Sequence, residues 1–204
     1  MIVDVIGRDA GVEMMFEKLG HRVYTLENPF EWYREDEKNS PDVVVFTGGS
    51  DVTPILYNEE NTASGCNSQR DMKEMVFFHR FHKHPKLGIC RGGQFLNVMS
   101  GGRMIQDYPG HAIADTHEAV DRKRNTRIQV TSTHHQIMVG SPSSVNYMYA
   151  VNPDGINTAE CIWYGHTNSL CFQPHPEYLE ADRKKNPMLG FLQHVFADNF
   201  GLEL

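Results

Sequence analysis

Residues 87–94 read LGICRGGQ, and the helical run FLNVM of residues 95–99 follows directly. Gly88 and Gly92, two positions before and after Cys90, permit a sharp bend and a close approach of helix to strand. The segment therefore predicts a nucleophile elbow, with the Cys90 sulfur at the tip of a sheet. Because a free cysteine with a pKa of about 8.5 is only slightly ionised at neutral pH, this thiol needs a base.

The first half of the chain alternates strand-like and helix-like runs. Strands are expected at residues 2–6, 22–26, 43–46 and 87–89. Helices are expected at residues 12–19 and 68–81, the second capped by Ser68. The core-facing residues of this second helix would be Met72, Met75, Val76 and either Phe78 or His79. This order predicts a doubly wound, mostly parallel α/β sheet, which binds its ligands at the carboxyl ends of the strands.

The pattern changes beyond Gly101. Short strand-like runs occur at residues 104–106, 127–131, 147–151, 158–163 and 169–172, and they indicate β-rich additions to the α/β core. A final amphipathic helix opens at Asn186-Pro187 and runs to Phe200. Since no linker or low-complexity tract interrupts the 204 residues, we expect a single domain over residues 1–204.

The charge balance narrows the class of partner. A formal net charge of −7 argues against a nucleic-acid or anionic-membrane surface, which would need a broad basic patch. The basic run at residues 122–124 is expected to be a solvated loop. The N-terminus enters a strand without a charged leader, and no apolar run reaches the roughly 18 residues of a membrane span, so we expect a cytoplasmic protein.

Cysteine and histidine spacing suggests no metal site. The four cysteines, which we interpret as free thiols of a reducing compartment, are Cys66, Cys90, Cys161 and Cys171. His79 and His82 would share one helical face, with His84 just beyond, but no third ligand of suitable spacing follows. We therefore expect neither a metal nor a cofactor.

Backbone donors for an oxyanion hole are expected on two segments beside Cys90. Residues 47–51, TGGSD, follow the buried strand 43–46, and their adjacent glycines leave backbone N–H groups free to face a ligand. The N–H of Arg91, the residue after the nucleophile, would point to the same place. We assign the oxyanion hole to Gly49 and Arg91.

A base and an orienting group are expected at the end of the strand 169–172. His175 can accept the thiol proton, and Glu177 can hold the imidazole in the required tautomer and stabilise the imidazolium. The predicted catalytic triad is Cys90, His175 and Glu177.

The elbow together with His175-Pro176-Glu177 resembles the class I glutamine amidotransferase superfamily. Residues 47–57, the pair Arg70-Asp71, residues 132–136 and residues 153–155 are most similar to its γ-glutamyl-γ-aminobutyrate hydrolase branch, peptidase C26. The resemblance covers residues 2–178. It implies a flavodoxin-like sheet and a γ-glutamyl thioester on Cys90 that water releases.

The same resemblance implies a pocket for the glutamyl group. Gln94 would contact its α-amino acid end, and the main chain around His135 and Gln136 would complete the pocket. Where relatives usually have an aromatic residue before the His-Pro-Glu motif, this chain has Pro174, which removes an N–H and alters one wall. Residues 58–67 and 110–117 are expected to form the amine side, whose specificity the sequence leaves open.

Three functional hypotheses remain open at this stage. The first is a free-standing hydrolase that cleaves glutamine or a γ-glutamyl-amine and releases glutamate with ammonia or an amine. The second is a glutaminase subunit that delivers ammonia to a separate synthetase. The third is a γ-glutamyl sensor or scaffold with a vestigial triad, which the intact Cys90, His175 and Glu177 disfavour.

Overall fold

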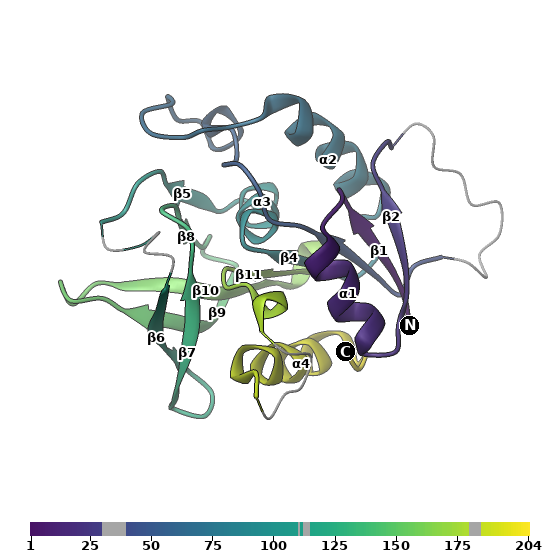
Figure 1. Ribbon diagram of the computed structural model, residues 1–204. Helices are drawn as coiled ribbons and strands as arrows, with labels where there is room; N and C mark the ends of the chain where they lie inside the picture. The colour runs from purple at the N-terminus through teal and green to yellow at the C-terminus, as the bar shows by residue number, and fades with distance from the viewer. Residues whose placement is uncertain (30–39, 110, 112–114, 180–184) are drawn as a thin grey trace.

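The computed structural model describes residues 1–29, 40–109, 111, 115–179 and 185–204. Its strands form one 11-stranded sheet in the order β2-β1-β3-β4-β11-β10-β9-β6-β7, with β5 and β8 paired beside this path. Figure 1 shows helices on both sides of the part of the sheet that contains β1, β4 and β11. This is the predicted doubly wound α/β fold.

Five strands form the parallel part of the sheet. They are β1 (Ile2–Ile6), β2 (Arg22–Leu26), β3 (Val43–Phe46), β4 (Lys86–Ile89) and β11 (Ser169–Phe172). All four residues of β3, β4 and β11 are buried, because helices cover both faces of these strands. Cys90 follows β4 and His175 follows β11, so the pairing of these two strands brings both residues to one edge.

Antiparallel strands confirm four of the five runs expected as β-rich additions. The fifth, residues 169–172, is instead the buried core strand β11, because it pairs in parallel with β4. The antiparallel strands are β5 (Arg103–Ile105), β6 (Asp115–Asp121), β7 (Thr126–Ser132), β8 (Ile137–Val139), β9 (Val145–Val151) and β10 (Asn157–Tyr164). The sequence pattern did not predict β6 and β8. β6 has the polar sequence DTHEAVD and β8 only three residues, so neither gives a strong apolar signal.

The helices form two layers, one on each face of the sheet, and each layer packs through its own hydrophobic cluster. One cluster packs α1 (Ala10–Lys18) and α4 (Pro187–Phe200) against one sheet face, through residues such as Phe16 and Leu192. The other packs α2 (Ser68–Arg80) and α3 (Arg91–Met99) against the opposite face, through Phe77 and Phe95. Three 3₁₀ helices complete the described elements: η2 (Pro54–Tyr57), η3 (Gly165–Thr167) and η4 (Pro176–Tyr178).

The predicted inner face of α2 is correct for Phe78, which is buried, and for Met75, which packs against the core, but wrong for Met72. Met72 is 68% exposed, whereas the buried residues are Asp71, Glu74, Phe77 and Phe78. The helix begins at Ser68, but its cap is Asn67, whose side chain accepts a hydrogen bond from the Arg70 N–H. Two acidic residues face inward because a buried arginine of the elbow binds them, as described below.

The cysteines are unpaired, as the sequence predicted. All four cysteines are free thiols, and only Cys66 is not fully buried.

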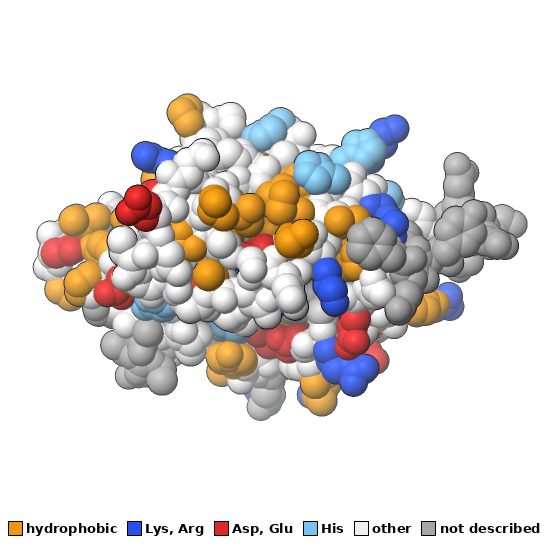
Figure 2. Space-filling model, turned by 90° about the horizontal axis from the view of Figure 1, so that it is seen from above, with side chains coloured by type: hydrophobic (Ala, Val, Ile, Leu, Met, Phe, Trp, Pro, Cys, Tyr) orange, Lys and Arg blue, Asp and Glu red, His pale blue; other side chains and the backbone are white. Residues whose placement is uncertain are grey.

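Figure 2 shows hydrophobic, acidic, basic and histidine side chains interspersed on the face seen from above, without a broad basic patch. Two residues of the basic run have acidic partners within the chain: Lys123 pairs with Asp198, and Arg124 pairs with Asp121. None of the described helices combines the length and apolarity that crossing a bilayer requires.

Candidate active site

Cys90 occupies a strained turn between β4 and α3. Its backbone has φ 50° and ψ −112°. The other non-glycine residues with positive φ in the described part of the chain are asparagines, which tolerate this region better than cysteine does. A strained residue of this kind costs about 1–3 kcal/mol and is often found where function needs it. The predicted nucleophile elbow is therefore present in the backbone.

The glycines around Cys90 are required by close backbone contacts. A Cβ atom on Gly88 would collide with the Gly92 carbonyl, and one on Gly92 would collide with the Phe46 carbonyl. A Cβ on Gly93 would lie 2.9 Å from the Phe172 nitrogen. α3 thus approaches β3, β4 and β11 more closely than any side chain would allow.

His175 is held by three neighbours. Its Nδ1 lies 2.5 Å from Glu177 Oε1, its backbone N–H donates to Thr131 Oγ1 at 2.7 Å, and its ring stacks on Tyr178 with 4.2 Å between centroids. Since Glu177 engages Nδ1, the other ring nitrogen, Nε2, is left for the thiol. Tyr178 was not predicted from the sequence, because nothing in its position after the motif marks a stacking partner.

The environment of His175 favours the imidazolium. Burial alone would lower its pKa, but hydrogen bonds and charge interactions with Cys90 and Glu177 outweigh burial and raise the pKa to about 10. A Cβ on Gly48 would lie 3.0 Å from His175 Cε1 and 3.9 Å from Cys90 Cβ, so Gly48 lies beside both groups. The structure thus brings Cys90, His175 and Glu177 together, with Gly48 beside them.

We expect Glu177→Gln to lower the pKa of His175, because the carboxylate is one of the two groups that raise it. His175 would then lose its proton at a lower pH than in the unchanged protein, and turnover should fall by about 10²–10⁴-fold as the imidazole loses its orienting partner. Histidine-selective NMR titration would measure the pKa. The exposed Glu17→Gln serves as the control. An identical titration midpoint in both variants would contradict the assignment of Glu177.

The two predicted oxyanion donors lie on segments that flank Cys90. Arg91 is the first residue of α3, so its N–H belongs to the first turn, where backbone donors have no partner inside the helix. Gly49 has φ +143°, and a Cβ there would collide with the Arg70 guanidinium. Arg70 donates to the carbonyl oxygens of Thr47 and Gly48 at 2.9 and 2.8 Å, which fixes the loop that contains Gly49.

The side chain of Arg91 has a separate, structural role. It is 1% exposed and pairs with the buried carboxylates of Asp71 and Glu74. Glu74 also binds Arg70 Nε at 2.7 Å, and Asp71 accepts a hydrogen bond from the Thr53 N–H at 3.0 Å. This ion network joins the elbow to the 47–51 loop through α2. Glu74 was not predicted from the sequence, although a glutamate one helical turn after the pair Arg70-Asp71 is a recognisable pattern for such a network.

Side-chain amides gather next to the nucleophile. Gln94 is 2% exposed, and its Nε2 lies 3.3 Å from Gln173 Oε1 and 3.4 Å from the Gln136 carbonyl oxygen. Gln173 Nε2 in turn lies 3.7 Å from Cys90 Sγ. Gln94 and Gln136 are thus brought together as predicted. Gln173 was missed, since a glutamine at the end of a strand has no distinguishing pattern.

The side chain of His135 contacts two acidic residues and none of those amides. Its ring nitrogens lie 3.1 Å from Asp51 Oδ2 and 3.3 Å from Asp107 Oδ1, and its carbonyl accepts from the Tyr108 N–H. The segment 58–67 does reach the predicted pocket, because Gln136 Nε2 donates to Ser64 Oγ at 2.6 Å. Of the segment 110–117, residues 110 and 112–114 lie outside the described residues. Pro174 is buried between Gln173 and His175.

Comparison with known proteins identifies the family of this chain. Residues 38–177 match the family Peptidase C26. The glutamine amidotransferase-like protein YvdE of Lactococcus lactis is 34% identical over 145 residues, which are 68% of this chain and 59% of that protein. A protein of Mycobacterium tuberculosis that carries the name of a glutamine amidotransferase is 32% identical over 157 residues, which are 66% of this chain and 50% of that protein. The matches thus span between half and three-fifths of the length of these two relatives.

Solved structures show the same fold. A glutamine amidotransferase from Thermotoga maritima superposes with a TM-score of 0.69 at 16% identity, covering 99% of both chains. PurLQS from the same organism gives a TM-score of 0.60 at 15% identity, with 86% of this chain and 87% of that one covered. With the matched family segment extending over both the elbow and the His-Pro-Glu motif, the chain belongs to the peptidase C26 branch of the class I glutamine amidotransferase superfamily.

Proposed function

We propose that the protein hydrolyses a γ-glutamyl amide, either glutamine or a γ-glutamyl-amine, through a thioester on Cys90. The observation that carries the proposal is the strained Cys90 beside a histidine whose pKa is raised and whose Nδ1 is bound to a carboxylate. Backbone strain lowers stability and tends to persist at functional sites, and strongly shifted pKa values also cluster there, so both features support a catalytic role.

The proposed reaction has two steps. Cys90 Sγ attacks the γ-carbonyl carbon, the carbon–nitrogen bond breaks, and the leaving nitrogen takes a proton from His175. Water then attacks the thioester, glutamate leaves, and the sulfur departs as thiolate while His175 takes up the proton of the water. The negative charge on the carbonyl oxygen in both steps would be stabilised by the N–H groups of Gly49 and Arg91.

The buried amides support a glutamyl-end pocket. The amide of Gln173 contacts Cys90 Sγ through its nitrogen and Gln94 through its oxygen. Gln94 in turn contacts the Gln136 carbonyl, so these groups continue outward from the nucleophile. Amide groups can donate to a carboxylate and accept from an ammonium group, the two charges of an α-amino acid. We propose that Gln94, with His135 and Gln136 through their main chain, binds this end of the substrate.

The alternative is a glutaminase subunit that passes ammonia to a separate synthetase. Its motivation is that the relatives carry amidotransferase names, and that one structural neighbour, from Thermoplasma acidophilum, is named as a component of a GMP synthase. The chemistry at Cys90 would be the same, but the isolated chain would be nearly inactive. The two functions therefore share one site. They differ in whether the isolated chain is active or only its complex with a synthetase.

A mass-spectrometric screen of the purified protein tests both functions. Its substrates would be glutamine, γ-glutamyl-γ-aminobutyrate, γ-glutamyl polyamines and nucleotide-linked γ-glutamyl amides. Robust release of glutamate by the isolated chain supports the hydrolase, whereas activity that requires a co-purified synthetase supports the alternative. If no substrate turns over and a glutamine-analogue chloroketone does not label Cys90 in folded protein, both proposals are wrong and the chain is a sensor or scaffold.

A further inference from the structure

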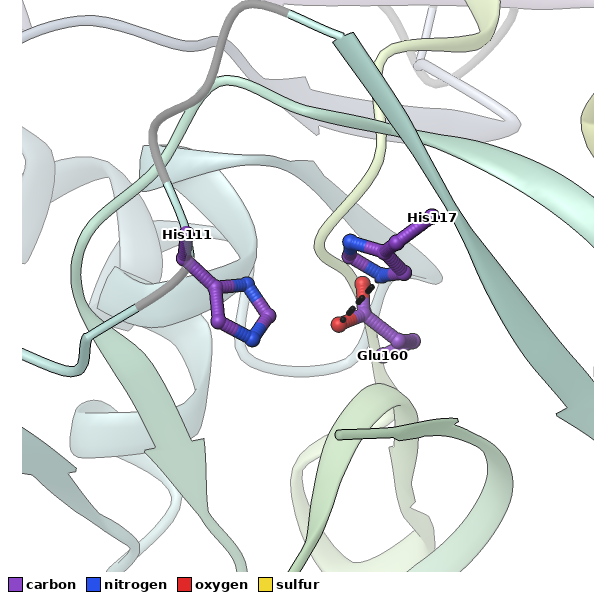
Figure 3. A group of neighbouring side chains, drawn as sticks. All are labelled: His111, His117 and Glu160. Carbon is purple, nitrogen blue, oxygen red and sulfur yellow. Dashed lines mark ion pairs between the residues drawn. The ribbon is translucent and has the colours of Figure 1, made fainter. Parts of the chain in front are cut away.

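Three imidazoles and one carboxylate meet inside the β-rich half of the molecule. His117 lies on β6, Glu160 on β10, His111 before β6, and His134 in the loop after β7. One ligand atom each from His111, His117 and Glu160 all lie within 4.8 Å of one another. Figure 3 shows these three side chains pointing toward a common space from separate segments. His134 adjoins them, with its ring 4.9 Å from that of His111.

Glu160 is buried without compensation by hydrogen bonds. It is 0% exposed, and neither carboxylate oxygen has a hydrogen-bond partner among the described residues. His117 Nε2 lies 3.2 Å from Oε1 and His134 Nε2 lies 3.9 Å from Oε2, and neither nitrogen makes a hydrogen bond among the described residues. A carboxylate removed from water needs a positive charge close by. The two imidazole nitrogens and the carboxylate are close enough together to serve as ligands of one cation.

We propose that His111, His117 and Glu160, with His134 as a fourth ligand, bind a divalent transition-metal ion of the Zn²⁺ type. Imidazole nitrogen with carboxylate oxygen is the donor set that zinc and related first-row ions take in proteins, usually in tetrahedral geometry. Calcium and magnesium prefer all-oxygen sites and do not suit it. Because zinc–ligand bonds are about 2.0–2.2 Å long, the side chains would close in slightly around the ion.

The outer contacts of the imidazoles fit a metal site. His134 Nδ1 lies 3.0 Å from the Gln136 carbonyl oxygen, so this nitrogen carries the proton and Nε2 keeps its lone pair. His111 has Asn152 Oδ1 at 3.1 Å from Nε2 and Ser132 Oγ at 3.4 Å from Nδ1. One ring nitrogen can therefore keep an outer partner while the other binds the ion. Burial also lowers the pKa of His111 and His134, which favours neutral rings.

The proposed metal site adjoins the candidate active site through the backbone. The Gln136 carbonyl that accepts from His134 also accepts from Gln94, and the Glu160 carbonyl accepts the Gln173 N–H at 2.9 Å. An ion bound here would brace the wall that carries Gln94 and Gln173. Its role is structural support of that wall, distinct from the thiol chemistry at Cys90.

Metal titration of chelator-treated, dialysed protein tests the site. Cys90→Ser should be the background, because a free Cys90 beside His175 is itself a zinc ligand set. We expect calorimetry with Zn²⁺ to give one ion per chain, and Co²⁺ to give the visible absorption of a four-coordinate site without a thiolate band. Zn²⁺ at about 100 times its dissociation constant should raise Tm by about 5–10 °C.

Variants locate the ion. Glu160→Gln and His117→Ala should each weaken Zn²⁺ binding by about 100-fold or more, since even outer contacts are worth 10–100-fold. His79→Ala with His82→Ala, two exposed histidines on α2 and just beyond it, is the matched control and should bind as the background does. Far-UV circular dichroism without metal checks folding, and His134→Gln replaces any variant that fails it. Absence of stoichiometric binding, or binding that survives both Glu160→Gln and His117→Ala, overturns the proposal.

Discussion

Cys90→Ala should reduce glutamate release by at least about 10⁴-fold, to the level that binding and the oxyanion donors alone provide. No other cysteine can replace Cys90, because none of the other three thiols lies at the end of β4. Cys161 and Cys171 are fully buried within strands. Mass spectrometry of glutamate released from whichever amide is the best substrate would measure the loss. Cys66→Ala, at a half-buried thiol outside the triad, should retain full turnover.

Two further variants separate loss of chemistry from loss of folding. Cys90→Gly should also be inactive, yet it should unfold at a slightly higher temperature, because glycine accepts φ 50° without strain. Cys90→Ala with His175→Ala should be hardly worse than Cys90→Ala alone, since the members of a triad act as one unit. Turnover by Cys90→Ala within 10-fold of the unchanged protein would refute the covalent mechanism.

The sequence predicted the elbow well because the constraint there is local. Gly88, Gly92 and Gly93 are required by backbone contacts so close that no other residue fits, and such positions are visible in the sequence itself. The continuous apolar run Val43–Phe46 is equally direct evidence for a central strand. The placement of His175 beside Cys90 then follows from the parallel pairing of β4 with β11.

Prediction failed where long-range contacts override the local pattern. On α2 the hydrophobic spacing favoured Met72 as an inner residue, but Arg91, seventeen positions or more from its partners, draws Asp71 and Glu74 inward. On β6, His117 faces inward toward the buried Glu160. In the sequence alone, a polar residue at such a position is indistinguishable from one in a loop, so the strand was not predicted. Buried polar groups are recognised only when their partners are known, and those partners are distant in sequence.

Arg91→Met should lower the free energy of unfolding by about 3–5 kcal/mol, which for a chain of this size corresponds to a Tm lower by roughly 10 °C. Methionine fills similar space, but it leaves the Asp71 carboxylate without its arginine and leaves Glu74 with Arg70 alone, although both acidic side chains are only 3% exposed. Urea denaturation followed by circular dichroism would measure the change. Arg103→Met, at an exposed position on β5, should change the unfolding free energy by less than about 0.5 kcal/mol.

The cause of that loss can be tested by removing the negative charges as well. Adding Asp71→Asn and Glu74→Gln to Arg91→Met should recover much of the stability, because the penalty comes from unpaired buried charge rather than from lost packing. Recovery of stability need not restore turnover, since Arg70 would lose the Glu74 carboxylate that orients it toward the Gly48 carbonyl. If the triple variant is no more stable than Arg91→Met, the ion network is not what holds α2 against the elbow, and the packing of Phe77 and Phe95 must do so instead.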